Sequence, residues 1–399
     1  MNQIVAKLPF KVASYAKTLM PDVAASDKPL RVVMWGTYDL GKPRTRILRD
    51  GLVEIGVEVT EIHADIWSSD ADKSQLSRAR MILRLFQLLF AYPALIYRYL
   101  RAPAHDLVIV PYLGQFDVIV LWPFAKLRGR PVVLDLFLSL YDTVVNDRKM
   151  VKPNSVVARC LKKVERLSCL CAGRILLDTQ THAHRIATLF DLDRETVDAV
   201  PVGAEPGAFA NVPPRSPHNG PTRILFYGQL IPLHGVETIL QAAMSERGRQ
   251  HQWHIIGSGQ DQSTVAEALA SGDCAHVKWD RWVPYEDLAS AIEKADVCLG
   301  VFGTSDKAAS VVPNKVYQSL FAKRSVITRD APAMHEIFAQ PDPALRLVPA
   351  ADPAAILDAI SALEADGFPA IGPELLEGAQ PAQIAKNLCA KIAPLVKRT

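Results

Sequence analysis

Short runs rich in β-branched and aromatic residues alternate with helical patterns along most of this chain. Such alternation is typical of parallel sheets whose strands are joined by helical crossovers. The expected strands are 31–35, 57–62, 106–111, 131–135, 174–177, 197–200, 223–227, 253–256, 276–279, 296–302, 325–328 and 345–348. Helices are expected between them, for example at 44–55 and 155–171. The sequence therefore predicts an α/β fold.

A segment rich in proline and glycine, 203–222, divides these strands into two groups and places a domain boundary at 205–222. The expected parts are a leader (1–30), an N-terminal domain (31–204), the linker (205–222), a C-terminal domain (223–375) and a last helix (376–399) that packs back on the N-terminal domain. Ligands of open parallel sheets bind beyond the carboxyl ends of the strands. We therefore expect two Rossmann-like domains with a ligand cleft between them.

Composition excludes several classes of protein. The 399 residues are 49% hydrophobic and 22% charged, which is ordinary for globular domains. A net charge of +3 gives no case for nucleic acid as a partner. The six cysteines show no zinc spacing, and reduced thiols are expected. We find no signal peptide pattern and no uncharged apolar stretch long enough to span a bilayer.

The stretch 311–330 contains the strongest candidate site. A polar loop, 303–310, leads into a helix that we expect to start at Pro313, and Asn314 follows in its first turn. Lys315 and Gln318 are three residues apart and share one face of that turn. A cation and an amide beside a helix N-terminus suit a phosphorylated ligand with hydroxyl groups. A capped surface helix with a solvated lysine is the competing interpretation.

Two glycine turns precede this stretch. The loop from Gly228 to Gly235 joins a strand to a helix, and it contains Gln229 and His234. Backbone N–H groups at such a helix start can bind an anion, although an ordinary βα turn has the same pattern. Gly257 lies in a second turn of this kind, where a lone G-x-G is a weak signal. Farther on, Trp-Val-Pro at 282–284 offers backbone groups for a base, or a packed tryptophan.

The N-terminal domain offers two charged candidates. Asp135 ends an expected strand, where a carboxylate could hold a substrate hydroxyl group or simply stabilise a loop. Arg44 starts a helix beside the loop at 36–41, where it could contact a phosphate or an acceptor, or remain solvated.

Residues 74–105 form a basic, apolar segment. It contains five arginines and no acidic residue, with long aliphatic and aromatic side chains between them. Arg84 and Pro93 argue against a membrane-spanning helix, and the composition favours an amphipathic element at a lipid interface. The alternative is two crossover helices on the sheet, whose arginines reach outward to solvent.

The ordered set of motifs resembles the GT4 (group 1) glycosyltransferases, enzymes of the GT-B fold that use nucleotide sugars with retention of configuration. The resemblance is carried by Gly-Gln-Leu-Ile-Pro-Leu-His-Gly at 228–235, Ile-Gly-Ser-Gly-Gln at 256–260, Trp-Val-Pro at 282–284 and Val-Pro-Asn-Lys-Val-Tyr-Gln at 312–318. It covers roughly 223–336 well and extends loosely to 35–44 and 134–137.

The resemblance implies a role for each motif. The loop 228–235 and Lys315 would face the donor diphosphate, and Gln318 the ribose hydroxyl groups. Val283 and its neighbours would receive the base through backbone groups, while Gly36 and Thr37 would approach the phosphates from the other domain. We expect Asp135 and Lys315 to be the catalytic residues.

This sequence departs from the family pattern at four positions, Gln229, His234, Val311 and Gln318. The family's acidic pair maps near Val311 and Gln318, and neither residue is acidic. Gln229 and His234 stand where many members have arginine and lysine, so the phosphate charge is less fully countered. Gln318 stands where many members have glutamate, but an amide can still hydrogen-bond a hydroxyl group.

The function expected is a metal-independent retaining hexosyltransferase of polysaccharide biosynthesis. It would be cytoplasmic and peripheral on the inner face of the membrane, and would act on a lipid-linked or envelope saccharide. The nucleotide sugar is a substrate, so no cofactor is expected. The alternative is a non-catalytic GT-B-like nucleotide-binding or scaffold subunit of a glycan assembly complex, with a nucleotide-sugar epimerase or hydrolase as a third option.

Overall fold

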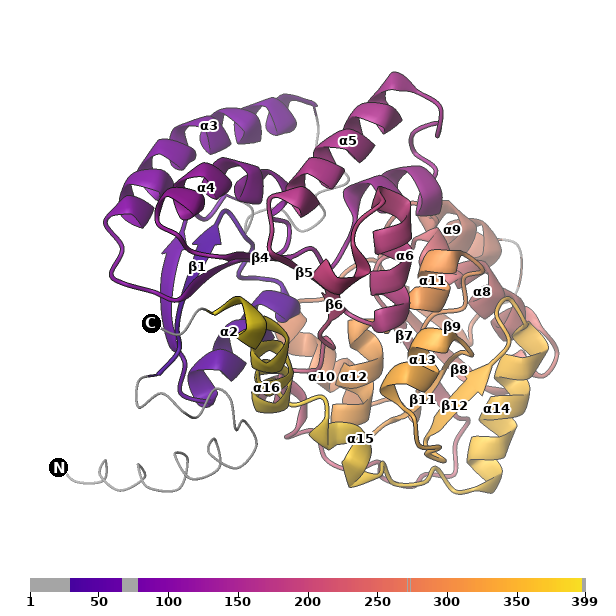
Figure 1. Cartoon of the computed structure of the whole chain (residues 1–399). Coiled ribbons are helices and arrows are strands. Elements are labelled where there is room, and N and C mark those ends of the chain that lie inside the picture. Colours follow the sequence, from indigo (N-terminus) through magenta and orange to yellow (C-terminus); the bar gives the residue numbers. More distant parts are fainter. Residues whose placement is uncertain (1–28, 67–77, 271, 273, 397–399) are drawn as a thin grey trace, which may run out of the picture. The chain divides into compact units, whose positions relative to one another are not determined.

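The computed structural model describes residues 29–66, 78–270, 272 and 274–396 (Figure 1). The expected leader lies outside this range apart from its last two residues. The strands form two six-stranded sheets. Their paired strands run parallel, for example β1 with β2 and β7 with β8. The α/β fold class is confirmed.

The first sheet has the order β2-β1-β3-β4-β5-β6. Its strands are β1 (Arg31–Gly36), β2 (Glu58–His63), β3 (Leu107–Val110), β4 (Val132–Asp135), β5 (Arg174–Leu177) and β6 (Val197–Ala199). The central strands β3 and β4 are buried along their whole length, as expected for a parallel sheet covered on both faces.

The second sheet has the order β12-β11-β10-β7-β8-β9. Its strands are β7 (Arg223–Tyr227), β8 (Gln252–Ile256), β9 (Val277–Asp280), β10 (Val297–Leu299), β11 (Ser325–Arg329) and β12 (Leu345–Val348). One core cluster joins this sheet to its helices through side chains such as Phe226, Ile239 and Trp253. The strand expected to reach Phe302 ends at Leu299, because Phe302 N donates instead to His234 O in a neighbouring loop.

Helices connect the strands of both sheets. Those of the first half are α2 (Pro43–Glu54), α3 (Arg78–Leu100), α4 (Gln115–Leu127), α5 (Val156–Leu170) and α6 (Gln180–Phe190). Those of the second half are α7 (Pro206–Phe209), α8 (Val236–Met244), α9 (Gln262–Ala270), α10 (Leu288–Glu293), α11 (Asp306–Ser310), α12 (Asn314–Phe321), α13 (Pro332–Ile337), α14 (Pro353–Ala365), α15 (Pro373–Glu377) and α16 (Pro381–Ile392).

Two helices differ from interpretations of the sequence. α3 is one continuous helix with Pro93 inside it, whereas the alternative interpretation of 74–105 had two shorter crossover helices. Pro313 precedes the first residue of α12 in an extended conformation, so it caps that helix instead of starting it. The N-terminal half of 74–105 remains partly outside the described residues, because these resume at Arg78.

The chain divides into two compact units. The first holds the described residues up to Phe137, together with Arg166–Leu176 and those from Pro381 onward. The second holds Leu138–Glu165 and Leu177–Gln380, so the segment 205–222 lies inside it. That segment is tied down: Lys323 Nζ donates to the carbonyl oxygens of Ala210 and Val212 at 3.1 and 3.0 Å.

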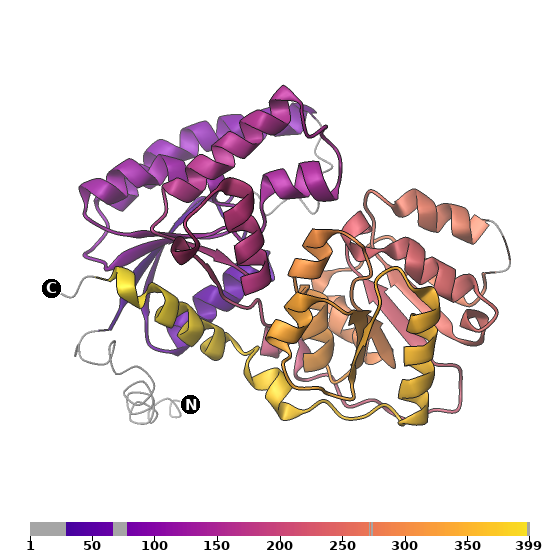
Figure 2. The same ribbon diagram turned by 45° about the vertical axis from the view of Figure 1, so that its right-hand side comes forward.

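The C-terminal helix packs within the first unit. Figure 2 shows α16 alongside α2, and the two helices are in contact. Leu48 and Leu52 of α2 and Ile384 and Leu388 of α16 are all buried. The first sheet is thus covered by α2 and α16 on one face and by α3 and α4 on the other (Figures 1 and 2).

Candidate functional site

Lys315 is a buried cation in the second unit. Its side chain lies in the first turn of α12 and is 6% exposed. Among the described residues, Nζ has no hydrogen-bond partner, and it lies 3.9 Å from the centroid of the Phe226 ring. Burial lowers the pKa of Lys315 well below its usual range. A buried ammonium group without a counter-ion is costly, so this position favours an anion that would pair with it.

Gly228 and His234 converge on the same ammonium group. Gly228 follows β7 with a φ of +140°, and any Cβ added there would lie 2.9 Å from Lys315 Nζ. The same Cβ would lie 3.2 Å from Cε1 of His234. A side chain would therefore fill the space beside the lysine, which only glycine leaves open.

His234 is held as a neutral ring. Its Nδ1 is hydrogen-bonded to the Gln229 carbonyl oxygen, so Nδ1 carries the proton and Nε2 has the free lone pair. Burial, and then the nearby Lys315, lower the pKa of His234 well below its usual range. His234 can therefore accept a hydrogen bond in this site but adds no positive charge.

The other residues of the first glycine loop have structural partners. The Gln229 side chain accepts a hydrogen bond from Arg148 Nη2 at 2.9 Å. Gly235 has left-handed backbone angles and leads directly into α8, whose first N–H groups point out of the helix end. Gly257 packs backbone to backbone, since a Cβ there would lie 1.9 Å from Gly228 O. Gly257 thus fixes the position of Gly228.

Gln318 is the first member of a chain of three hydrogen-bonded side chains. This side chain is 5% exposed, and its Nε2 lies 3.4 Å from Tyr285 Oη, which in turn donates to Glu205 at 2.7 Å. Pro313 caps α12, and Asn314 is half-buried in its first turn. Val283 is half-buried two residues before Tyr285, while its neighbour Trp282 is 67% exposed.

In the first unit, Gly36 and Thr37 already contact a carboxylate. Thr37 N donates to Asp117 Oδ2 at 2.6 Å, and its hydroxyl group lies 3.1 Å from Oδ1. A Cβ on Gly36 would lie 2.3 Å from the same carboxylate. Burial raises the pKa of Asp117, and the hydrogen bonds from Thr37 and Tyr92 oppose that rise. The two residues expected to approach a phosphate therefore surround an acidic side chain.

Asp135 and Arg44 pair with each other. Arg44 Nη2 lies 2.8 Å from Asp135 Oδ1, and Nε lies 3.1 Å from Oδ2. Both side chains are buried, at 1% and 0% exposure. This bidentate ion pair joins α2 to β4. Its geometry gives both residues a structural role, and their contact with substrate stays a prediction.

The structure thus brings together part of the predicted site. Gly228, His234 and Lys315 converge, and Gln318 lies on the same short helix. The sequence interpretation did not assign Phe226, Tyr285, Arg148 or Asp117 to any site. Tyr285 directly follows Trp-Val-Pro, which could have drawn attention to it. No local pattern marks the other three.

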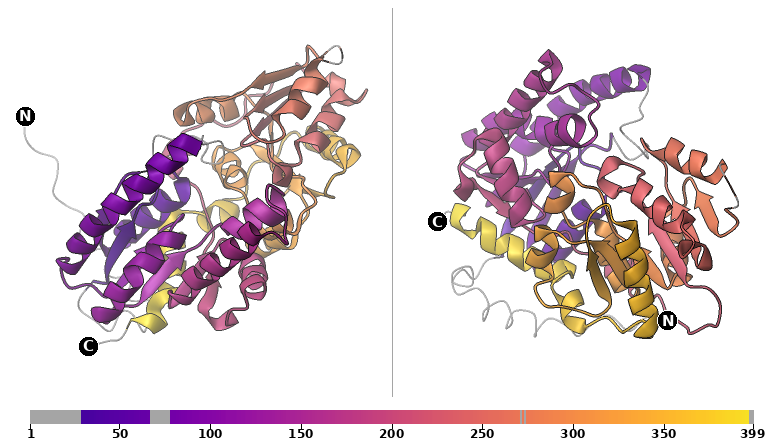
Figure 3. Two further views of the ribbon diagram at one scale, coloured as in Figure 1. Left: turned by 90° about the horizontal axis from the view of Figure 1, so that it is seen from above. Right: turned by 90° about the vertical axis from the view of Figure 1, so that its right-hand side faces the viewer.

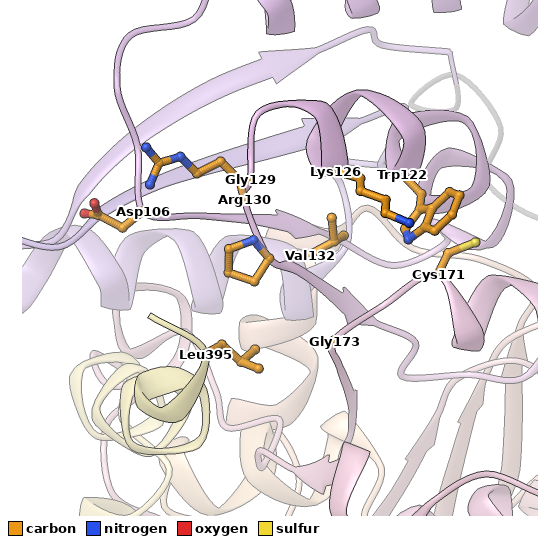
Figure 4. Close-up of a pocket in the computed structure, with 10 residues that line it drawn as sticks. Asp106, Trp122, Lys126, Gly129, Arg130, Val132, Cys171, Gly173 and Leu395 are labelled. Carbon is orange, nitrogen blue, oxygen red and sulfur yellow. The ribbon is translucent and has the colours of Figure 1, made fainter. Parts of the chain in front are cut away.

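No group of three or more His, Cys, Asp and Glu side chains in the described part of the chain could hold a metal ion. No described helix is both long and apolar enough to cross a membrane. A pocket of about 470 Å³ lies in the first unit, lined by Trp122 and Lys126 of α4, and also by Arg130 and Leu395 (Figure 4). It lies next to Asp106, Pro131 and Gly173, at the amino ends of β3, β4 and β5, away from the strand ends where parallel sheets bind ligands.

Comparison with known proteins identifies the fold. The catalytic domain of starch synthase IV from Arabidopsis thaliana, bound to ADP and acarbose, superimposes with a TM-score of 0.63 at 9% identity, covering 94% of this chain and 100% of that one. Sucrose-phosphate synthase from Thermosynechococcus elongatus gives 0.60 at 16% identity, covering 92% and 95%. HepE of Anabaena, in complex with UDP and glucose, gives 0.61 at 12% identity, covering 91% and 99%. These are GT-B glycosyltransferases, and the GT-B fold predicted from the sequence is confirmed.

A family comparison narrows the class further. Residues 221–366 match the family described as "Glycosyl transferases group 1", which confirms the resemblance seen in the sequence. The matched part of the chain contains Lys315 and both glycine turns. No curated protein sequence matches the chain significantly.

Proposed function

We propose that this protein is a retaining glycosyltransferase that moves a hexose from a nucleotide sugar to a hydroxyl group of a lipid-linked or envelope polysaccharide acceptor. The observation that carries the proposal is the buried Lys315 ammonium group, which has no partner among the described residues and lies beside the space left open by Gly228. A diphosphate placed there would supply the missing negative charge.

Each residue of the site has a defined task in this proposal. The bond between the sugar's anomeric carbon and the diphosphate breaks, and the leaving diphosphate keeps the electron pair. Lys315 and the N–H groups at the starts of α8 and α12 would stabilise that charge, which is an effect worth several kcal/mol in a water-poor site. The acceptor oxygen forms the new bond to the anomeric carbon, and its proton passes to the leaving diphosphate. His234 Nε2 could accept a hydrogen bond from a sugar hydroxyl group.

The remaining donor contacts follow the expected pattern. Gln318 would hydrogen-bond the ribose, and Tyr285 fixes its amide through the 3.4 Å contact. The backbone at Val283 would receive the base. The proposal uses no metal ion and no cofactor, because the cation that neutralises the diphosphate is a side chain.

The acceptor class rests on the basic, apolar segment 74–105. It supports a cytoplasmic protein held peripherally at the inner face of the membrane, where lipid-linked saccharides are available. The described part of this segment includes α3, on which the apolar side chains Phe86, Leu89 and Phe90 are exposed.

The test is release of nucleoside diphosphate from a panel of UDP- and GDP-sugars in the presence of a lipid extract. Turnover with one donor is expected, and Lys315→Met should abolish it. Lys294→Met, at an exposed lysine beside α10, is the matched control and should be fully active. The absence of both turnover and nucleotide binding in the native protein would refute the proposal.

The second candidate is a non-catalytic nucleotide-binding or scaffold subunit. It is motivated by the neutral side chains at Gln229, His234 and Gln318, and by the bond that already engages Gln229 with Arg148. This candidate predicts weak or absent nucleotide binding, and glycan assembly that depends on a partner and is unchanged by Lys315→Met.

A further inference from the structure

α3 has two apolar faces, of which only one is covered by other described residues. Leu95 and Tyr99 are buried, and Trp35 Nε1 donates to the Leu95 carbonyl at 3.2 Å, so this face packs on the first sheet. The opposite face has large apolar side chains that are 45–74% exposed: Phe86, Leu89, Phe90, Tyr97 and Leu100. Their spacing of three, four and seven residues places them along one side of the helix. A crossover helix of a soluble domain would have polar side chains there.

α4 extends the same exposed surface. It lies beside α3 and is in contact with it (Figures 1 and 3). Tyr92 of α3 donates a 2.8 Å hydrogen bond to Asp117 of α4. Phe116 at its first turn and Leu127 at its end are 54% and 79% exposed. The last turn of α5 adds Leu167 and Leu170, also exposed, where Ser168 Oγ donates to Gln115 O at 2.7 Å. We call this apolar face of α3, α4 and the end of α5 the outer helical face.

The charges around the outer helical face have one sign. Arg98 and Arg101 are exposed on and just after α3, and Lys126 is exposed on α4. Two of these cations stack on exposed aromatic rings: the Arg101 guanidinium lies 4.3 Å from the Tyr97 ring and Lys126 Nζ 5.0 Å from the Trp122 ring. α3 contains no acidic residue, and the single acid of α4, Asp117, is buried beneath the helix. Apolar and aromatic groups at the centre with cations among them match the interface of an anionic bilayer.

We propose that the outer helical face binds a lipid bilayer containing anionic lipids, with α3 and α4 lying in the plane of the interface. The exposed phenylalanine and leucine side chains enter the acyl region, and Tyr97 and Trp122 lie at the headgroup level together with the cations stacked on them. A second protein copy is the less suitable occupant, because like-charged rims would repel each other across a symmetric interface.

The surface has a fixed relation to the first sheet. α4 begins only a few residues after β3 ends at Val110, so its N-terminal end, with the exposed Phe116, lies at the carboxyl edge of the sheet. A bilayer on the outer helical face therefore places lipid headgroups near the strand ends of the first domain, where ligands of parallel sheets bind. The inference concerns a surface separate from Lys315, so it holds whether or not sugar transfer is the reaction.

Flotation with vesicles of phosphatidylcholine, with and without phosphatidylglycerol, tests the proposal on the full chain. The native protein is expected to float with the anionic vesicles and to dissociate as salt is raised. Phe86→Gln with Phe90→Gln, and separately Phe116→Gln with Leu127→Gln, should each weaken binding by at least about tenfold, because each removes two large apolar side chains. Arg101→Gln should weaken binding to anionic vesicles by roughly fivefold. Val53→Gln, at a side chain of α2 that is 58% exposed, is the matched control and should bind as native.

The outcomes separate this inference from the donor site. Melting temperatures and nucleotide binding should be unchanged in every variant, since each altered side chain is exposed. No flotation of the native protein, or equal flotation of all variants, would overturn the inference. A native dimer that the Phe86→Gln and Phe90→Gln pair converts to a monomer would also overturn it, by showing that a second copy occupies the surface.

Discussion

The two domains each contain a deeply buried cation, and the two cations are treated in opposite ways. In the first, Arg44 is paired through two nitrogen atoms with Asp135, and both side chains are inaccessible. In the second, Lys315 is also buried but faces an aromatic ring and the open space beside Gly228. Loss of either member of a buried ion pair leaves the other charge unpaired and destabilises the domain. A buried charge without a partner is instead stabilised when a ligand of opposite charge binds. The contrast separates a structural charge from a binding charge, and four experiments test it.

The largest effect is expected from removing the paired cation. Arg44→Met leaves Asp135 buried without its counter-charge, which should lower the free energy of unfolding by about 3–5 kcal/mol. Urea unfolding measures the change. Arg44→Met together with Asp135→Leu should recover most of the loss, because no charge is then left unpaired. A fully stable Arg44→Met protein would show that the pair is not structural.

Removing the unpaired cation should affect activity and leave stability unharmed, the opposite of the result expected for Arg44. Lys315→Met relieves the cost of a buried ammonium group, so the melting temperature of the free protein should be equal or higher. Turnover of the nucleotide sugar should fall by about 10²–10³, the range for losing one preorganised charge-stabilising group. Loss of stability without loss of nucleotide binding would place Lys315 in the same category as Arg44.

The third experiment uses pH. Burial lowers the pKa of Lys315 in the free protein, and a bound diphosphate would raise that pKa again, so binding takes up a proton. Nucleoside diphosphate affinity should therefore increase as the pH falls below the usual pKa range of lysine, by at most about tenfold per pH unit for one proton. Calorimetry in buffers of different ionisation enthalpy counts the proton. The Lys315→Met variant is the control for titration of the ligand, and its protein should take up no proton on binding.

The smallest effect is expected from filling the space beside Gly228. Gly228→Ala adds a Cβ 2.9 Å from Lys315 Nζ at a backbone φ of +140°, which is strained for any other residue. The expected cost in the free energy of unfolding is about 1–3 kcal/mol. Nucleotide affinity should fall as well, since the added methyl group displaces the ammonium group. Gly207→Ala, where an added Cβ meets nothing within 4 Å, is the control and should be neutral in both measurements.

Much of the fold could be predicted from the sequence because its signals are local. Every expected strand is present, and 174–177, 223–227 and 345–348 have the observed bounds. The segment that follows Trp-Val-Pro begins as a 3-10 turn, Tyr285–Asp287, before α10. Periodicity cannot show where hydrogen bonding leaves a sheet, which is why the strand ending at Leu299 was expected to continue to Phe302.

The candidate site could be predicted only in part. Pro313, Lys315 and Gln318 are close in sequence, so their position at the start of one helix could be predicted. The contact of Asp117 with Thr37 could not be predicted, because the two residues are 80 positions apart. Phe226, below the Lys315 ammonium group, lies on a different element and looked like an ordinary strand residue.

The sequence by itself determined the alternation of strands and helices, the two parallel sheets, and the glycine turns and lysine that resemble those of the group 1 glycosyltransferases. These features depend on residues within a few positions of one another. Tertiary structure decided which charges are satisfied: Arg44 meets Asp135 across 91 positions, while Lys315 is buried with no acid beside it among the described residues. Burial and pairing set the energy of a charge, and both depend on side chains that only the folded chain brings together.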